Sequence, residues 1–494
     1  MSIWQEDIQK NTYDELNNDI DVDILIIGGG ITGISTAYHL LKSNLKVIVV
    51  EKNSIASGVT AKTTGKLTYL QDLMFSKISD KYSFDVAKQY YESQKDAIKL
   101  VRNIVEENKI YCDYVVQKSY LFASEKSEVI KVKKEQELLE KFGEKVGIVK
   151  KLPINIHNFY GISVSDTAYF HPVKYVNELA KICQKNGIQI YENTNVFDFK
   201  LDNNKYICYT NNNKIIAKKI VFACHYPFFT VPFLFPIKGY LERSYISASP
   251  VDKNKPVSGI NTSKNTTSFR YHSSLGKNYL IYLKGSHNLA FKYNVCDNFK
   301  ELNKDLEKLD LIPNYLWSNE DIITNDYLPY IGLISDNLYI GVGYNTWGMT
   351  NGSLAGLILS DMILGKNNKY ISLFNPMRDM AIDNVFSIIY DTYSSVKSII
   401  DSKIYKNKKF YSDRVVFTKK NGKDVAIYID KDGIKHMVYN KCPHLKCNLI
   451  FNEEELTWDC PCHSSRFDLD GYVIKGPSNY NISYKKSNKK KKMD

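Results

Sequence analysis

A glycine-rich turn between two apolar segments constrains the fold of this chain more than any other feature. Residues 22–51 read VDILIIGGGITGISTAYHLLKSNLKVIVVE. The apolar run 22–27 predicts a buried parallel strand, and a second one at 45–50 follows a helical segment that extends to about Ser43. The turn between the first strand and the helix carries a G-x-G-x-x-G pattern at Gly28, Gly30 and Gly33. This order predicts a β–α–β unit that binds a dinucleotide.

Each residue of the motif has a physical task. Gly28 permits the tight turn, Gly30 lets the backbone approach a pyrophosphate, and Gly33 lets the helix pack closely on the strand. Glu51 ends the second strand and can accept hydrogen bonds from ribose hydroxyls. Its charge would repel a 2′-phosphate, so NADP is disfavoured, whereas the motif alone does not separate NAD from FAD.

Later segments extend this prediction. Residues 57–68, SGVTAKTTGKLT, form a small, hydroxyl-rich loop that can donate N–H and O–H groups to a pyrophosphate and let a flat ring pass. Residues 219–227 predict a third apolar strand that breaks at a turn. Residues 338–365 read as a strand, a glycine-rich turn and a helix, whose N-terminus could face another edge of the ligand.

Taken in this order, the segments resemble the D-amino-acid-oxidase-type family of FAD-dependent oxidoreductases over about residues 20–365. The resemblance implies an α/β fold, in which a Rossmann-type FAD-binding domain (about 20–85, 165–235 and 325–375) is interrupted by an α+β substrate domain (about 86–164 and 236–324). It also implies FAD contacts: the ADP half at Gly28, Gly30, Gly33 and Glu51; the pyrophosphate and ring at Thr63, Thr64 and Gly65; the adenine end at Val196; and the isoalloxazine at Gly343, Trp347, Gly348 and Met349.

The chain departs from this family at one informative place. Several amino-acid oxidases of the family hold the substrate carboxylate with an arginine near the C-terminal turn, but this turn reads GYNTWG, residues 343–348. Arg243 and Arg270, in the predicted substrate domain, could substitute, although a structural role is the ordinary one for both. An amine and an amino acid therefore both stay open as substrate, and no catalytic residue is predicted. The candidates for lining the pocket are Tyr240, Arg270, Tyr344 and Trp347.

A second set of functional residues lies near the C-terminus. Cys442 and His444 form C-x-H, and after fifteen intervening residues Cys460 and His463 form C-x-x-H. Two thiolates and two imidazoles suit a four-coordinate zinc ion. They equally suit a Rieske [2Fe–2S] cluster, in which each of two loops supplies one Cys and one His.

The segments CPHLKC and WDCPCHSSRFDLDGYVIKGP closely resemble Rieske proteins of the respiratory type. That resemblance implies iron ligation by Cys442, His444, Cys460 and His463. It also implies a disulfide between Cys447 and Cys462, the two cysteines that a zinc site would leave unused. Ser465 matches a serine that hydrogen-bonds a bridging sulfide. Phe467 replaces a tyrosine of the high-potential members, which predicts a lower potential here.

Residues 376–405 carry a helical apolar pattern, and beyond Tyr411 the segments RVVFTKK, DVAIYID and HMVYN predict short strands. The domain boundary is therefore expected near residue 405, with an oxidoreductase part at 1–405, an all-β Rieske part at 406–484 and a basic disordered tail at 485–494. The tail carries six lysines and one aspartate of a chain whose net charge is +12. The other charges form no stripe, so we expect no nucleic-acid partner. The apolar run 220–237 contains three prolines, which argues against a spanning helix and makes membrane contact improbable.

Five scattered cysteines with no disulfide spacing, together with an N-terminus that lacks a signal-like apolar run, favour the cytoplasm. The two cofactors together indicate an amine or amino-acid dehydrogenase, which passes electrons from flavin through the cluster to an external acceptor, a protein or a quinone. The alternatives are an oxidase that uses oxygen and a non-catalytic electron carrier or redox sensor.

Overall fold

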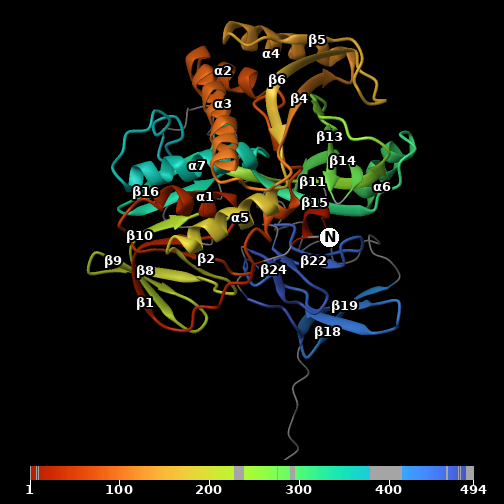
Figure 1. Ribbon diagram of the computed structural model, residues 1–494. Coiled ribbons are helices and arrows are strands. Elements are labelled where there is room, and N and C mark those ends of the chain that lie inside the picture. Colours follow the sequence, from red (N-terminus) through yellow and green to blue (C-terminus); the bar gives the residue numbers. More distant parts are fainter. Residues whose placement is uncertain are drawn as a thin grey trace, which may run out of the picture. The chain divides into compact units, whose positions relative to one another are not determined.

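The computed structural model describes residues 2–6, 8, 11–226, 238–274, 276–289, 295–378, 414–444, 446–462, 465–476, 478 and 480–484. The chain divides into two compact units. The first comprises Met1–His287 with Asn298–Ile388, and the second comprises Asn288–Asp297 with Ile389–Asp494. Each unit is described separately below, and Figure 1 labels their elements.

The first unit contains a mixed sheet built around the predicted β–α–β unit. Four parallel pairings give the order β17-β10-β1-β2-β7, and β16 and β9 add antiparallel neighbours. Among the described residues this sheet has eight strands: β1 (Ile20–Ile27), β2 (Val47–Val50), β7 (Gln189–Tyr191), β8 (Asp198–Asp202), β9 (Lys205–Tyr209), β10 (Lys214–Phe222), β16 (Tyr330–Ser335) and β17 (Leu338–Val342).

Both faces of the central strands are buried, as the continuous apolar runs predict. One face packs against helices α1 (Ile31–Leu40), α5 (Pro172–Lys185) and α7 (Gly348–Ile363), which lie together in Figure 1. The other face packs against residues of the β8–β9 hairpin, such as Tyr206 and Cys208. Helix α1 contacts α7 closely, because a Cβ on Gly356 would lie 2.4 Å from the Cβ of Ser35. The glycine turn is thereby fixed between the sheet and two helices.

A second sheet belongs to the same unit and has the order β15-β11-β14-β13-β12-β4-β6-β3, with β5 beside β6. Its nine strands within the described residues are β3 (Lys66–Leu67), β4 (Val115–Ala123), β5 (Gly147–Val149), β6 (Tyr160–Tyr169), β11 (Gly239–Val251), β12 (Val257–Asn261), β13 (Thr267–Ser274), β14 (Lys277–Asn288) and β15 (Tyr315–Thr324). The accompanying helices are α2 (Met74–Lys81), α3 (Phe84–Glu107), α4 (Val129–Lys141) and α6 (Val295–Glu307), with short 3-10 turns at Ile3–Gln5, Val59–Lys62 and Lys126–Glu128.

The second unit contains two small antiparallel sheets. One has the order β18-β19-β20, and the other has the order β21-β22-β23-β24. Their bounds are β18 (Val415–Lys420), β19 (Lys423–Ile429), β20 (Lys435–Tyr439), β21 (Ile450–Asn452), β22 (Thr457–Asp459), β23 (Arg466–Phe467) and β24 (Val473–Lys475). Phe451, Trp458 and Phe467 form the centre of its core together with the buried Cys442, Cys447 and Cys460. The three strands predicted from RVVFTKK, DVAIYID and HMVYN are β18, β19 and β20.

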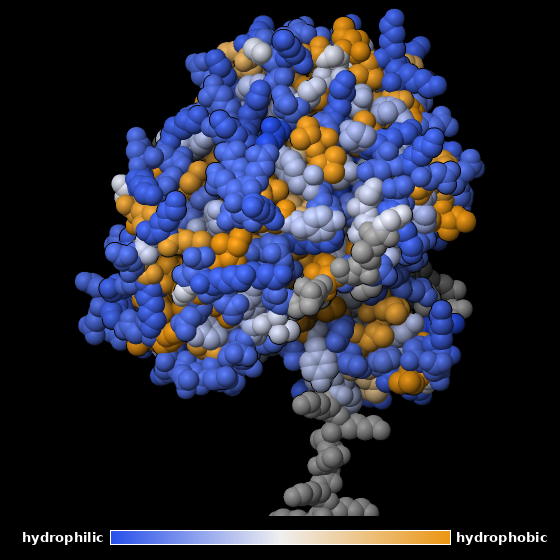
Figure 2. Space-filling view, in the orientation of Figure 1, coloured by the Kyte–Doolittle hydropathy of each residue, from blue (hydrophilic) through white to orange (hydrophobic). Residues whose placement is uncertain are grey.

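Several predictions fall on other parts of the chain. The apolar helix predicted over 376–405, the boundary near 405, much of the run 220–237 and the tail 485–494 lie wholly or largely outside the described residues. Within the described residues, none of the helices has the length and apolarity needed to cross a membrane. The face shown in Figure 2 is mostly hydrophilic, with apolar residues in separate groups.

Candidate cofactor sites

The glycine turn after β1 leaves no room for a side chain at Gly28 or at Gly33. Gly28 has φ +114°, which favours glycine, and its N–H donates to the carbonyl of Val50 at 2.9 Å. A Cβ on Gly33 would lie 1.9 Å from the carbonyl oxygen of Gly28. Gly30 caps the N-terminus of α1, so that the first N–H groups of the helix lie at this turn. The turn fits a bound pyrophosphate, because its backbone is open to close approach and its helix terminus favours anions.

Glu51 follows β2 and folds back onto the same turn. Its carboxylate accepts hydrogen bonds from the N–H of Gly29 at 2.8 Å and the N–H of Asn53 at 2.9 Å. Burial raises the pKa of Glu51, and the two N–H groups oppose that rise. The structure therefore brings the predicted acid and the predicted glycines together at the carboxyl ends of β1 and β2.

The loop 60–65 is held through its carbonyl groups. The carbonyl of Ala61 accepts from the Ser2 hydroxyl, and that of Thr63 accepts from the Trp4 indole N–H at 2.6 Å. Two further side-chain donors are the indole N–H of Trp317 on β15, bonded to the Lys62 carbonyl at 2.9 Å, and Nη1 of Arg270 on β13, bonded to the Gly65 carbonyl at 3.0 Å. The Gly65 carbonyl also accepts from the backbone N–H of Phe170 at 3.3 Å.

These bonds set the direction of the N–H groups in the loop. In a trans peptide, the N–H points opposite to the preceding carbonyl. Holding the carbonyls of Lys62 and Thr63 therefore turns the N–H groups of Thr63 and Thr64 away from the donors. Thr63 and Thr64 are two of the predicted cofactor residues. The loop thus presents its backbone N–H groups on one side. On the other side its carbonyl groups accept hydrogen bonds from the side chains of Ser2, Trp4, Trp317 and Arg270.

Sequence reasoning missed four residues of this loop environment, namely Ser2, Trp4, Thr60 and Trp317. Thr60 accepts a hydrogen bond from the N–H of Ile31, the first residue of α1, at 3.2 Å and so joins the loop to the glycine turn. Ser2 and Trp4 reach the loop from the N-terminal segment, and Trp4 is fully buried. The tryptophan in a polar N-terminus, MSIWQEDIQK, was a signal that could have revealed this docking.

The C-terminal turn after β17 contacts α1. The Tyr344 hydroxyl lies 2.8 Å from the hydroxyl of Thr32, and burial raises the pKa of Tyr344. The side chain of Asn345 bridges this turn to the end of β15, accepting from the N–H of Thr324 at 2.7 Å and donating to the carbonyl of Tyr327. Trp347 caps the N-terminus of α7, which begins at Gly348. The turn and the glycine motif therefore lie against one another.

The other predicted residues occupy varied places. Val196 is buried in the loop between β7 and β8, and Met349 is buried in the first turn of α7. Tyr240 lies near the start of β11 and pairs with Ile323 of β15. The two candidate arginines differ, because Arg243 forms a buried ion pair with Glu320, whereas Arg270 bonds to backbone carbonyls. The structure thus gives Arg243 the structural role expected for it.

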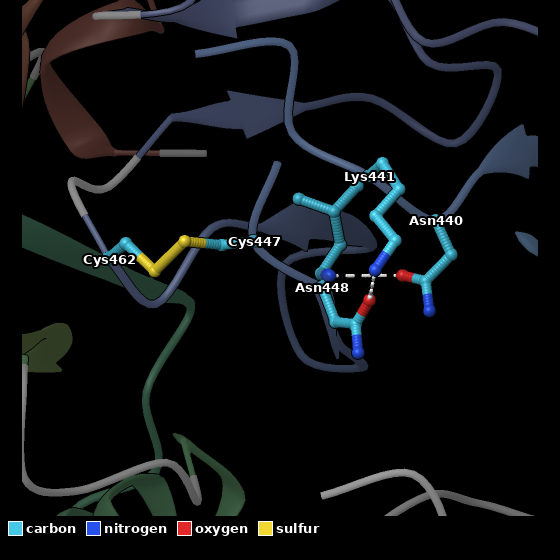
Figure 3. The surroundings of a disulfide bond; sticks show 6 residues. Asn440, Lys441, Cys447, Asn448 and Cys462 are labelled. Carbon is cyan, nitrogen blue, oxygen red and sulfur yellow. Dashed lines mark hydrogen bonds between the residues drawn. A yellow bond between two sulfur atoms is a disulfide. The ribbon is translucent and has the colours of Figure 1, made fainter. Parts of the chain in front are cut away.

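The second unit brings two cysteine-containing loops together. A disulfide joins Cys447 of the first loop to Cys462 of the second, as the resemblance implied (Figure 3). The first loop is a tight turn in which the N–H of Cys442 donates to the carbonyl of Cys447. Its base is held where the Lys441 ammonium donates to the Asn448 side chain at 2.6 Å (Figure 3).

The predicted ligands that the structure describes lie in these two loops. Cys442 and Cys460 are buried thiols outside the disulfide, and the sulfur atoms of Cys447, Cys460 and Cys462 lie within 4.8 Å of one another. His444 lies in the first loop, where burial lowers its pKa and so favours the neutral imidazole. His463 lies outside the described residues. Cys442, His444 and Cys460 supply the soft sulfur and imidazole donors that suit an iron–sulfur cluster.

Two neighbours of the second loop, Ser465 and Phe467, are buried in the second unit. Ser465 is fully buried, and its hydroxyl oxygen accepts from the N–H of Ser478 at 2.9 Å, which leaves the hydroxyl hydrogen for another acceptor. The N–H of Cys460 donates to the carbonyl of Ser465. Phe467 is fully buried on β23, opposite Trp458. A phenyl ring there offers no hydrogen-bond donor to the site.

Comparisons with known proteins place both units. Residues 23–362 match the family of FAD dependent oxidoreductases (DAO), and residues 402–485 match the Rieske [2Fe-2S] domain. The chain therefore belongs to the FAD dependent oxidoreductases of the DAO family and carries a C-terminal Rieske domain. This confirms the predicted fold class and both predicted cofactors, FAD and a [2Fe–2S] cluster, and it decides against the zinc alternative.

Individual similar proteins match either nearly the whole chain or about three quarters of it. The chain is 30% identical to YhfW of Bacillus subtilis (strain 168), named as a Rieske 2Fe-2S iron-sulfur protein, over 96% of this chain and 95% of that protein. It is 20% identical to gamma-glutamylputrescine oxidoreductase of Escherichia coli (strain K12), over 74% of this chain and 88% of that protein. The crystal structure of glycine oxidase from Geobacillus kaustophilus shares the fold, with a TM-score of 0.61 and 18% identity, over 73% of this chain and 100% of that chain.

Proposed function

We propose that this protein is an amine or amino-acid dehydrogenase that passes electrons from FAD through the Rieske cluster to an external acceptor. The observation that carries the proposal is the presence of both cofactor domains on one chain, a combination supported by YhfW, which is similar over nearly its whole length. A flavin that exchanged electrons only with substrate and oxygen would have no use for a one-electron carrier.

The proposed FAD site consists of residues that converge in the first unit. The ADP half would contact Gly28, Gly30, Gly33 and Glu51, and the loop N–H groups at Thr63 and Thr64 would serve the phosphates and ring. Gly65 and the turn from Gly343 to Met349 would approach the isoalloxazine, and the backbone of Val196 the adenine end. The carbonyl bonds to Ser2, Trp4, Trp317 and Arg270 support this assignment, because they orient the loop before the cofactor arrives.

The proposed cluster ligands are Cys442 and Cys460 on one iron and His444 and His463 on the other. The disulfide supports this assignment by holding the two loops together. The buried surroundings, including Trp458 and Phe467, would keep water from the cluster. With Phe467 in place of a hydroxyl donor, we expect a reduction potential below that of the respiratory high-potential Rieske proteins.

The donor class is inferred from similar proteins and from chemistry. Gamma-glutamylputrescine oxidoreductase and glycine oxidase are named for an amine and an amino acid. When bound, FAD accepts a hydride from the carbon of a C–N bond, and a Rieske cluster carries one electron at a time. The donor would lose that hydride and a nitrogen proton to become an imine, which water hydrolyses. Such a reaction needs a neutral amine held in place more than a strong protein base.

The acceptor would be a protein or a quinone that takes electrons singly. A cytoplasmic location also stays a prediction. The buried thiols Cys112, Cys183 and Cys208 support it, since none of them is in a disulfide. The Cys447–Cys462 disulfide would then persist in a reducing compartment because Cys447 is fully buried and Cys462 is partly buried beside it.

Anaerobic mixing of the purified protein with a panel of amines and amino acids tests the donor class. We expect at least one compound to bleach the oxidised flavin absorbance without oxygen. A panel that leaves the flavin oxidised, with rapid bleaching by a reductase protein alone, would overturn the enzyme proposal and favour an electron carrier.

A further inference from the structure

Lysines gather at one end of the three-stranded sheet in the second unit, beside the first cluster loop. Three lie on the hairpin that joins β18 to β19, one stands at the base of the loop, and one lies within the loop. We call these five residues the basic patch: Lys419, Lys420, Lys423, Lys441 and Lys446. Lys441 is half-buried, and the other four are exposed. The hairpin and the loop lie well apart in the sequence, so only the fold brings their charges together.

The hairpin holds its lysines in a fixed register. Its turn is Asn421–Gly422, with φ of +50° and +73°, as in the tight two-residue turns that Asn-Gly favours. Lys420 therefore lies directly opposite Lys423. Like charges that face one another across neighbouring strands destabilise a sheet. The hairpin thus bears a small energetic cost that a binding role for its charges would explain.

The hairpin borders the loop that carries the predicted iron ligand Cys442. The N–H of Asn440 donates to the carbonyl of Asp424, the residue after Lys423, at 2.9 Å. The Lys441 ammonium lies 3.5 Å from the Asp424 carboxylate and also bonds across the base of the loop (Figure 3). Lys446 lies inside the loop, where its N–H donates to the Cys442 carbonyl at 2.9 Å. Asp424 offsets Lys441, and the other four lysines of the patch form no ion pair within the described residues.

The end of the described chain lies against the same hairpin. The rings of Tyr439 and Tyr484 are 5.3 Å apart. The ammonium of Lys420 lies 6.0 Å from the ring of Tyr484, and that of Lys423 lies 5.1 Å from the ring of Tyr439. The sequence that directly follows Tyr484, residues 485–494, adds six lysines and one aspartate. The most basic segment of the chain therefore starts at the basic patch.

We propose that the basic patch docks a small acidic protein, which accepts electrons singly from the cluster. In each transfer the reduced cluster loses one electron and the acceptor gains it, and no proton or further reactant is needed. Electron transfer falls off steeply with distance, so an acceptor must dock beside a cluster loop, where the patch lies. A positive surface attracts an acidic partner and speeds their encounter. The inference rests on the proposed function and names the class of its acceptor.

The observations favour an acidic protein over the other acceptors and surfaces. A quinone is neutral and gains nothing from a cluster of lysines. An anionic membrane surface would attract the same lysines. The tip of the hairpin, residues 418–424, reads TKKNGKD and offers no apolar side chain to enter a bilayer. Charge alone therefore distinguishes this surface, and a protein with clustered carboxylates is its complement.

Two forms of one acceptor test the inference on the full-length protein with both cofactors bound. The protein is reduced with dithionite, freed of excess reductant and mixed anaerobically with cytochrome c. Native cytochrome c is basic, and succinylation of its lysines makes it acidic while the haem stays the same. We expect the acidic form to be reduced at least about tenfold faster at low salt. The difference should vanish at about 1 M salt, where charges are screened beyond about 3 Å.

A hairpin variant locates the effect. The triple substitution Lys419→Gln, Lys420→Gln and Lys423→Gln removes three charges and should slow reduction of the acidic form about tenfold while iron content stays normal. Native cytochrome c should be reduced no more slowly than by the parent protein. The two cytochromes on the parent protein keep the inference testable even if this variant loses its cluster.

A matched control separates local charge from net charge. The substitutions Lys145→Gln, Lys150→Gln and Lys151→Gln remove three exposed lysines from the first unit, so both triple variants have the same net charge. The control should reduce the acidic cytochrome as fast as the parent protein does. Equal slowing in the two triple variants would overturn the basic patch as a docking surface.

The remaining outcomes separate this inference from its alternatives and from the proposed function. Equal rates with the two cytochromes would refute it. Such equality, together with hairpin-dependent binding to vesicles of phosphatidylserine and phosphatidylcholine in equal parts, would assign the patch to a membrane surface instead. Dithionite bypasses the substrate, so a preference for the acidic form can be found even where no amine bleaches the flavin. Flavin bleaching by an amine without that preference would keep the dehydrogenase and remove the docking surface.

Discussion

The two cofactor sites are assembled over very different distances along the chain. In the first unit, the loop 60–65 is held by side chains 59, 205 and 255 residues away. In the second unit, the disulfide that joins the cluster loops spans 15 residues. The flavin site therefore depends on the completed fold of the first unit, whereas the cluster site depends on two neighbouring loops. Substitutions that disrupt the flavin site should therefore leave the cluster site intact, and the reverse should also hold.

The largest expected effect is loss of the cluster. Cys460→Ser removes a buried thiol at the second loop and should abolish the cluster while FAD stays bound, since the flavin site lies in the other unit. Iron content and the flavin-to-protein absorbance ratio measure both outcomes. Cys208→Ala, a buried cysteine in the first unit, is the matched control and should keep its iron. Normal iron content in Cys460→Ser would contradict the ligand assignment.

The reciprocal substitution, which should disrupt the flavin site and spare the cluster, is Gly33→Ala. Its Cβ would lie 1.9 Å from the Gly28 carbonyl oxygen, so the phosphate turn must shift. Overpacking of this kind costs about 1–3 kcal/mol, and we expect a protein that retains its cluster but is purified largely without FAD. Gly58→Ala adds a Cβ with no atom within 4 Å and should bind FAD normally. Full FAD occupancy in Gly33→Ala would refute the assigned phosphate turn.

Removing the disulfide tests whether the stability of the cluster site is independent of the flavin site. Cys447→Ala with Cys462→Ala should lower the free energy of unfolding of the Rieske unit by about 3 kcal/mol, the value expected for a loop of 15 residues. Chemical denaturation followed by cluster absorbance measures it, and flavin release in the same samples serves as the internal control. A parallel loss of flavin stability would show that the two sites are not independent.

The long-range hold on the flavin loop is tested by Trp4→Phe, which keeps an aromatic ring but removes the N–H donor to Thr63. An unpaired buried carbonyl costs about 1 kcal/mol or more, so FAD should bind about fivefold more weakly. Titration of the apoprotein with FAD by fluorescence quenching measures this effect. Trp317→Phe should act similarly through Lys62, and unchanged affinity in both variants would remove the loop from the site.

The smallest expected effect is a pH dependence of the Rieske unit. Partial burial alone would lower the pKa of His436, but the carboxylates of Asp470 and Asp430 outweigh it and raise that pKa above the ordinary 6.5. A raised pKa means that protonated His436 stabilises the fold below pH 6.5 and that this contribution fades as the pH rises through the folded-state pKa. Denaturation from about pH 5 to about pH 8 should show the slope. His436→Gln should flatten the slope of stability against pH. An unchanged slope in that variant would show that another titratable group causes the pH dependence.

The same difference in distance explains what could be predicted from the sequence. The glycine turn and Glu51 are local patterns that spacing and residue type could predict, and the pairing of the cysteine loops was implied by the resemblance of two short local motifs to Rieske proteins. The four donors to the loop 60–65 come from Ser2, Trp4, Trp317 and Arg270, and no spacing rule connects them. The different fates of Arg243 and Arg270 were equally invisible, because only the fold places Glu320 beside one of them.

The central claim is that electrons pass from substrate through the flavin to the cluster. Low-temperature EPR on anaerobic full-length protein, mixed with a compound that bleaches the flavin, tests it most directly, with dithionite and the Cys460→Ser variant as controls. The account predicts a low-average-g Rieske signal raised by the substrate and absent from Cys460→Ser. A bleached flavin beside a cluster that only dithionite reduces would contradict it.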